Sequence, residues 1–201
     1  FFVEKGVLVP RPETEMIVDE VLHFLKSNPI QNPRILDLGT GSGCIGLSIS
    51  KNHPEATLVA VDQSETSRKI FLKNAEALNL TDRCQFISAD IDALDFSNLD
   101  LFDFIVSNPP YIDVADQRVQ KSVRDFEPET ALFAPDRGFA LLKSWSKKTT
   151  PLLKDKSLMI FEMGMDQGSE MLAYFQTLGA FNKVSVLKDL SGLDRFIKAV
   201  R

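Results

Sequence analysis

The chain has 201 residues, of which 44% are hydrophobic and 25% are charged, and its formal net charge is −5. This length and composition indicate one globular domain with a full hydrophobic core. The negative charge argues against general affinity for a nucleic acid backbone, and the sequence has no apolar run of transmembrane length and no signal-peptide pattern, so no membrane association is expected.

Cysteine and histidine are scarce in the sequence. The two cysteines, Cys44 and Cys84, form no CxxC pair, which fits a reducing cytoplasm. His23 falls within a helical pattern, and His53 lies in an Asn-His-Pro signature that typically ends a helix. A histidine-based catalytic triad or metal site therefore has little to draw on, and no metal is predicted.

The first segment predicts a short strand-like piece over 7–9, followed by Pro-Arg-Pro-Glu-Thr-Glu at 10–15 and then an amphipathic helix. Arg11, held between two prolines, is the unusual residue here. It is either a functional cation or a solvated side chain in a stiff loop.

A glycine-dense turn follows an apolar strand over 34–38 and precedes a helix that runs to about Asn52. Glycine permits positive φ and lets the backbone approach a ligand closely, while a helix N-terminus offers free N–H groups. Residues 41–46 satisfy the dinucleotide-binding pattern GxGxxG, which is weak evidence on its own. The candidate ligand-binding residues of the turn are Gly39, Thr40, Gly41, Ser42 and Gly43.

Acidic residues end the next two predicted strands. Asp62 ends the strand over 58–61, about 20 positions after the glycines, where a carboxylate typically accepts ribose hydroxyls. The alternative is a carboxylate that caps the helix beginning after Ser64. After the strand over 84–88, Asp90 is positioned to accept from an adenine amino group with Ile91 against the ring, although Asp92 and Asp95 follow and leave the choice of carboxylate open.

The most distinctive stretch is Asn108-Pro109-Pro110-Tyr111, directly after a buried strand over 102–107. Consecutive prolines donate no hydrogen bonds and end the strand, and the first proline holds Asn108 extended. The result is a stiff corner at the carboxyl end of a strand, where open α/β sheets bind ligands. The alternative is an ordinary turn, since Pro-Pro and Asn-Pro dipeptides are common turn signals.

This corner suits chemistry on a planar NH2 group. The side-chain oxygen of Asn108 and the carbonyl of Pro109 are two acceptors that can take both N–H protons of an incoming amide. Tyr111 can stack against the planar group, so that the nitrogen lone pair is directed at an electrophile.

The remaining segments complete an α/β pattern. Residues 112–137 are charged and irregular, a helix starts at 139, a strand covers 158–162, and a helix capped near Asp166 covers 167–178. Two final strands over 184–187 and 195–200 are too close for a crossover and must be antiparallel. We therefore predict a Rossmann-like, doubly wound, seven-stranded and mostly parallel sheet with a C-terminal antiparallel hairpin.

Two enzyme classes share the glycine turn and the acid after the second strand: nicotinamide dehydrogenases and S-adenosylmethionine-dependent methyltransferases. The second class is favoured by Asp37 in an Asp-x-Gly-x-Gly-x-Gly arrangement, by the terminal hairpin and by the corner beside the cofactor site. A dehydrogenase also needs a proton-handling residue, and none is evident.

Residues 37–43 together with 108–111 resemble the amino methyltransferases that act on planar NH2 groups. The segments 8–15, 111–113 and 126–132 further resemble the PrmC/HemK family of release-factor glutamine methyltransferases, a similarity that extends to 192–195. The resemblance implies the class I S-adenosylmethionine methyltransferase fold. It also implies methyl transfer to N5 of the glutamine in the Gly-Gly-Gln motif of class I peptide chain release factors.

The resemblance also implies roles for individual residues. Gly39 to Gly43 would line the methionine side of S-adenosylmethionine, Asp62 would bind the ribose, and Asp90 with Ile91 would border the adenine. Many family members have an aromatic residue in place of Ile91. Four residues would grip the substrate glutamine: Asn108, Pro109, Pro110 and Tyr111.

Three alternatives remain. A related enzyme group methylates a glutamine of ribosomal protein uL3 but generally lacks the Arg-Pro-Glu-Thr-Glu stretch. An adenine-N6 nucleic-acid methyltransferase is disfavoured by the charge and by the absence of a target-recognition domain. A non-catalytic adenosyl-binding module would not need the corner. The family also has an N-terminal helical domain that docks the release factor, and residues 1–201 are expected to hold only the catalytic domain.

Overall fold

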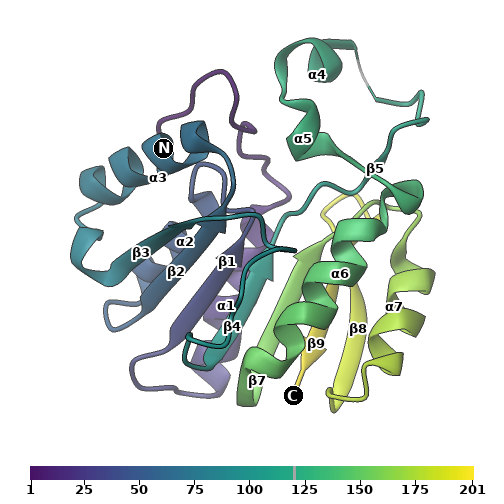
Figure 1. Cartoon of the computed structure of the whole chain (residues 1–201). Helices are drawn as coiled ribbons and strands as arrows, with labels where there is room; N and C mark the ends of the chain where they lie inside the picture. The colour runs from purple at the N-terminus through teal and green to yellow at the C-terminus, as the bar shows by residue number, and fades with distance from the viewer. Residues whose placement is uncertain (120) are drawn as a thin grey trace.

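A seven-stranded sheet with helices on both faces forms the centre of the structure, a computed structural model that describes residues 1–119 and 121–201 (Figure 1). The strand order is β3-β2-β1-β4-β7-β9-β8. Neighbouring strands are parallel except at β9, which is antiparallel to both β7 and β8. The strands are β1 (Arg34–Leu38), β2 (Thr57–Asp62), β3 (Cys84–Ser88), β4 (Phe102–Ser107), β7 (Leu153–Glu162), β8 (Lys183–Lys188) and β9 (Asp194–Val200). The predicted sheet and its terminal hairpin are confirmed.

The helices divide between the two faces according to the side chains they bury. On one face α1 (Glu15–Ser27), α2 (Cys44–Asn52) and α3 (Glu65–Ala77) share one hydrophobic cluster with the sheet. On the other face α6 (Ala140–Thr149) and α7 (Gly168–Thr177) share a second cluster. Successive strand residues point to opposite faces, so a central strand is mostly apolar, and the buried Asp37 of β1 and Asp103 of β4 are exceptions.

The order of strands changes direction between β1 and β4, which are direct neighbours. A crevice forms at such a switch point, outside the carboxyl ends of the strands. The glycine turn that starts at Gly39 follows β1, and Asn108 follows β4. The topology therefore brings the two distinctive motifs of the sequence to one edge of the sheet.

Local predictions at residues 7–9 and near Asp166 differ from the structure. Residues 7–9 form no strand. Val7 instead follows a turn closed by its N–H and the Glu4 carbonyl at 3.2 Å, and its side chain is buried. The helix predicted to be capped near Asp166 begins at Gly168 with Gln167 as its first flanking residue.

The segment predicted as irregular over 112–137 contains short elements, apart from Gln120, which lies outside the described residues. β5 (Ile112–Asp113) pairs in parallel with β6 (Phe133–Ala134), and these strands bracket the helices α4 (Lys121–Phe126) and α5 (Glu129–Leu132). In Figure 1 this excursion rises above the carboxyl end of the sheet. Within the described ranges, no helix is long and apolar enough to cross a lipid bilayer.

Candidate active site

The turn after β1 is held in place by a buried carboxylate. Asp37, which is fully buried, accepts hydrogen bonds at Oδ2 from the Thr40 hydroxyl at 2.7 Å and from the Gly46 N–H at 3.0 Å. Its Oδ1 has no hydrogen-bond partner within the described part of the chain. Burial raises the pKa of Asp37 from 3.8 to about 7, and the two hydrogen bonds only partly oppose that rise.

This raised pKa predicts a pH-dependent stability difference between the wild type and Asp37→Asn. As pH rises from 4 to 7 the unfolded chain loses the Asp37 proton first, so the folded wild type becomes less stable relative to the neutral variant, by at most about 4 kcal/mol. The asparagine keeps one oxygen acceptor, and the cost of its buried NH2 group does not change with pH. Urea unfolding of both proteins at pH 4.5 and 7.5 measures the difference, and a pH-independent difference would contradict the prediction.

The turn and the ends of β2 and β3 line one cleft. Gly41 lines this cleft and has φ 55°, a backbone conformation that favours glycine. The space beside its Cα is open, since the one atom that a Cβ would meet is Val7 Cγ1 at 3.7 Å. The structure brings seven sequence-predicted residues together in its lining: Gly39, Gly41, Asp62, Asp90, Ile91, Asn108 and Pro110.

The two acidic residues of this cleft both fix local backbone and retain free acceptor capacity. Asp62 accepts from the Gly41 N–H and from the Ser64 N–H, each at 2.9 Å. Asp90 accepts from the Asp92 N–H at 2.9 Å. A carboxylate has about four acceptor positions, so each can still bind a hydroxyl or an amino group. The helix α3 is capped by Ser64, whose hydroxyl accepts from the Ser67 N–H, and not by Asp62. Asp62 instead fixes the glycine turn and also lines the cleft.

Three of the residues predicted to bind the cofactor do not line the cleft. Thr40 and Ser42 are buried, and the Ser42 carbonyl accepts from the Asn74 side chain at 2.8 Å. Gly43 begins α2 and packs against Leu47 and Phe71. These residues shape the turn from behind its ligand-facing surface.

Other lining residues were not predicted. They are Trp145 and Leu141 of α6 and residues of two further segments, 6–8 and 128–131. Arg11 joins these two segments, because its Nη2 lies 2.9 Å from Glu127 Oε1 while the Val9 N–H donates to the same carboxylate at 3.3 Å. The single tryptophan of the chain and the proline-flanked Arg11 are both unusual residues in the sequence. The residues that they approach in the structure are distant in sequence, so their place beside the cleft could not be predicted.

The corner after β4 separates this cleft from a larger cavity of about 950 Å³. Asn108 lines both spaces, whereas Pro109 and Tyr111 line the larger one. The Tyr111 hydroxyl donates to Glu162 Oε1 at 3.0 Å, and burial raises the pKa of the tyrosine. Burial also raises the pKa of Glu162, opposed by hydrogen bonds from Thr14 and Tyr111 and by the charge of Arg195.

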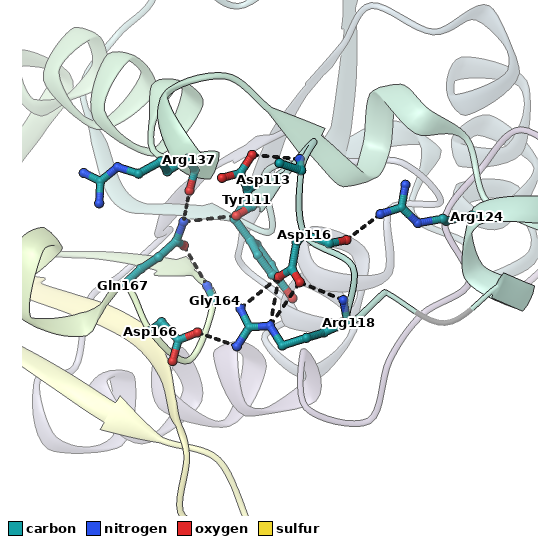
Figure 2. A network of polar contacts seen from close by, with 10 residues as sticks. Tyr111, Asp113, Asp116, Arg118, Arg124, Arg137, Gly164, Asp166 and Gln167 are labelled. Atoms are coloured by element: carbon teal, nitrogen blue, oxygen red, sulfur yellow. Dashed lines mark hydrogen bonds and ion pairs between the residues drawn. The ribbon is translucent and has the colours of Figure 1, made fainter.

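The side chain of Gln167, which directly precedes α7, supports the corner through hydrogen bonds to backbone groups (Figure 2). The Gln167 side chain donates to the Tyr111 carbonyl at 3.0 Å and to the Arg137 carbonyl at 3.3 Å, and accepts from the Gly164 N–H at 2.8 Å. Gly138, with φ 86°, passes so close that a Cβ would lie 2.0 Å from the Tyr111 carbonyl oxygen. The corner is consequently fixed by its neighbours as well as by its prolines.

Charged side chains surround the larger cavity. Arg118 binds Asp116 at 2.8 Å and Asp166 at 2.6 Å, and Arg124 donates to the Asp116 carbonyl (Figure 2). This network joins the excursion between β4 and α6 to the segment after β7. No cluster of three or more metal-ligating side chains occurs among the described residues.

Comparisons with known proteins agree with this geometry. The family model described as methyltransferase small domain matches residues 17–127. The release factor glutamine methyltransferase of Chlorobaculum tepidum is 36% identical over 97% of this chain and 67% of its own length, and that of Francisella tularensis is 38% identical over 98% and 68%.

Solved structures are similar as well. The release-factor-specific protein-(glutamine-N5) methyltransferase from Alicyclobacillus acidocaldarius has a TM-score of 0.56 and 28% identity, covering 100% of this chain and 99% of that one. The hMettl16 catalytic domain has a TM-score of 0.70 at 16% identity, covering 99% of this chain and 73% of its own, which supports the fold alone.

Proposed function

The chain belongs to the family of release factor glutamine methyltransferases, and on that premise we propose that it transfers a methyl group from S-adenosylmethionine to N5 of a glutamine in class I peptide chain release factors. The acceptor is the glutamine of the Gly-Gly-Gln motif. The observation that carries the proposal is the position of Asn108, which lines both the narrow cleft and the open cavity. A methyl donor in the cleft and a glutamine entering from the cavity would meet at this residue.

The residues of the cleft fit an adenosyl cofactor. The bare backbone at Gly41 allows close approach, the free acceptor positions of Asp62 suit ribose hydroxyls, and Ile91 is an apolar surface for a purine. When bound, S-adenosylmethionine supplies an electrophilic methyl carbon on a sulfonium. We propose that Asp90 binds the adenine amino group and that the turn holds the methionine end through Gly39 and Gly41. Behind them, Thr40, Ser42 and Gly43 keep the turn in shape.

The corner residues would orient the acceptor. The Asn108 amide oxygen and the Pro109 carbonyl would accept both N–H protons of the substrate glutamine, which turns the nitrogen lone pair toward the cleft. Pro110 keeps the corner stiff, and the Tyr111 ring would border the amide plane. No side-chain base is required before transfer, because the nitrogen loses its extra proton after it has become acidic.

We further propose that residues 1–201 constitute the catalytic domain and that the reaction takes place in the cytoplasm, where release factors act. The open cavity of about 950 Å³ is large enough to admit a protruding peptide loop. The formal charge of −5 gives no support to a nucleic acid acceptor.

A comparison of three acceptors in separate incubations tests the proposed substrate. The protein is incubated with methyl-labelled S-adenosylmethionine and one of three acceptors: an unmodified class I release factor, ribosomal protein uL3, or an adenine-containing oligonucleotide. We expect label only in the release factor. Label in uL3 or in the oligonucleotide instead would replace the proposed acceptor, and a release factor whose motif glutamine is changed to glutamate is the matched negative control.

The contact between Arg11 and Glu127 predicts an effect on cofactor binding. The two residues lie close in sequence to the segments 6–8 and 128–131, which line the cleft, so Arg11→Gln and Glu127→Gln should each loosen that lining and raise the KM for S-adenosylmethionine about 3- to 10-fold. The KM of the double variant should be no higher than that of either single variant, because both substitutions remove the same ion pair. Steady-state kinetics at saturating release factor measures this. Additive losses would mean that the two side chains act separately.

A further inference from the structure

The orientation of the Asn108 amide is set by a short chain of buried hydrogen bonds. Asn108 Nδ2 donates to Thr14 Oγ1 at 3.2 Å, and the Thr14 hydroxyl donates to Glu162 Oε2 at 2.7 Å. Thr14 is 3% exposed and Glu162 is 2% exposed. Thr14 immediately precedes α1, and Glu162 is the last residue of β7, so the chain of contacts joins segments that are 148 positions apart.

The direction of each hydrogen bond follows from the chemistry of its partners. Glu162 accepts at both oxygens, from Thr14 and from Tyr111, as an ionised carboxylate does, and the nearby charge of Arg195 favours that form over the neutral acid that burial favours. Since an ionised carboxylate can only accept, the single hydroxyl proton of Thr14 is committed to Glu162. The Thr14 oxygen therefore offers only lone pairs to Asn108. Only the NH2 end of the amide can face these lone pairs, because a flipped amide would oppose two acceptors. The amide oxygen is thereby kept on the side of Asn108 that is turned away from Thr14.

Glu162 holds the other end of the corner as well. Its second oxygen, Oε1, accepts from the Tyr111 hydroxyl at 3.0 Å. Both oxygens of this carboxylate are thus engaged by groups that belong to, or support, the corner. Glu162 lines the larger cavity, but both of its oxygens are occupied and only 2% of the residue is exposed, so it is poorly placed to act as a base toward a substrate.

We propose that Thr14 and Glu162 are positioning residues, which hold the Asn108 amide with its oxygen free to accept from the glutamine NH2 group. This inference rests on the proposed function, because the orientation of the Asn108 amide affects the reaction only if the methyl acceptor is an NH2 group. A wrongly oriented amide would present its own NH2 to the substrate NH2, and the two donors would repel each other.

The principal test is Thr14→Val, which keeps the volume of the side chain and removes both hydrogen bonds. We expect kcat for methyl transfer to fall about 10- to 100-fold, with the KM for S-adenosylmethionine essentially unchanged. Thr14→Ser keeps the hydroxyl and should restore kcat to within about threefold of the wild type. A thermal melt and a cofactor titration of both variants test whether the fold is retained, and both should match the wild type.

A second variant separates positioning from packing. Glu162→Gln presents an NH2 donor within the chain of contacts, which frees the Thr14 proton and permits the Asn108 amide to flip. We expect a similar fall in kcat, and the Thr14→Val/Glu162→Gln double variant should be no slower than the slower single variant. Wild-type kcat in Thr14→Val, or fully additive losses in the double variant, would overturn the proposal.

An independent measurement keeps this test separate from the proposed function. In 15N-labelled protein without substrate, the side-chain NH2 of Asn108 should show a nuclear Overhauser effect to the Thr14 methyl group and slowed exchange with solvent. The slowed exchange should be lost in Thr14→Val, because valine has no oxygen to accept the hydrogen bond, and it should be retained in Thr14→Ser. If the wild type does not methylate a release factor but these signatures are present, the proposed function fails while the positioning stands. If they are absent in the wild type, the positioning is wrong.

Discussion

Asn108→Ala is expected to lower kcat for methyl transfer by about 10²- to 10³-fold while the Kd for S-adenosylmethionine changes by less than about threefold. The reason is that the Asn108 amide oxygen contacts the acceptor nitrogen during transfer, whereas the cofactor is held mainly by the turn after β1 and by Asp62. Asn108 also lines the cleft, so a small change in cofactor affinity is consistent with this account.

Single-turnover methylation with saturating cofactor measures this effect, and calorimetric titration measures the affinity. The matched control is Asn98→Ala, because Asn98 is exposed and outside the lining of both spaces. An unchanged single-turnover rate in Asn108→Ala would rule out the assigned role.

Asp62→Ala should show the opposite pattern. Its carboxylate accepts from the backbone of Gly41 and of Ser64 and also faces the cleft, so its removal loosens the turn and deletes the proposed ribose acceptor. A hydrogen bond to a charged group contributes about 1.5–3 kcal/mol, which corresponds to a Kd for S-adenosylmethionine that is about 10- to 100-fold higher. At saturating cofactor, kcat should stay within about threefold of the wild type.

Calorimetric titration of S-adenosylmethionine and S-adenosylhomocysteine into both proteins tests this prediction. Asp82→Ala is the control, since Asp82 is exposed and away from the cleft. Equal affinities of the Asp62→Ala variant and the wild type would mean that Asp62 only shapes the turn. Together with Asn108→Ala, this variant separates cofactor binding from acceptor orientation.

Much of the fold could be predicted because the sequence patterns that indicate it lie within short stretches of the chain. The apolar runs of β1 and β4 are buried on both faces and therefore read as continuous hydrophobic strands, and the short turn before β9 leaves no room for a crossover. The same locality explains the cleft residues. Gly39, Asp62 and Asp90 each lie at or within two residues of the end of a strand, and parallel strands bring such ends to one edge of the sheet.

The features that could not be predicted depend on contacts between distant segments. Thr14 and Glu162 look like a helix-flanking threonine and a polar strand end, and only the packing of α1 against β7 makes them one buried pair. Residues 7–9 have strand-like composition, but β-propensity is context-dependent, and in the structure Val7 packs near Gly41 instead of pairing. Arg11 could not be assigned because its partner, Glu127, is 116 positions away.

The central claim is that this corner directs a glutamine nitrogen at the methyl donor, and tandem mass spectrometry of the methylated release factor tests it most directly. After incubation of the wild-type protein with S-adenosylmethionine and an unmodified class I release factor, the Gly-Gly-Gln peptide should carry one additional methyl group on the glutamine side-chain nitrogen. A methyl group on another residue, or an unmodified peptide although the protein binds the cofactor, would contradict the account.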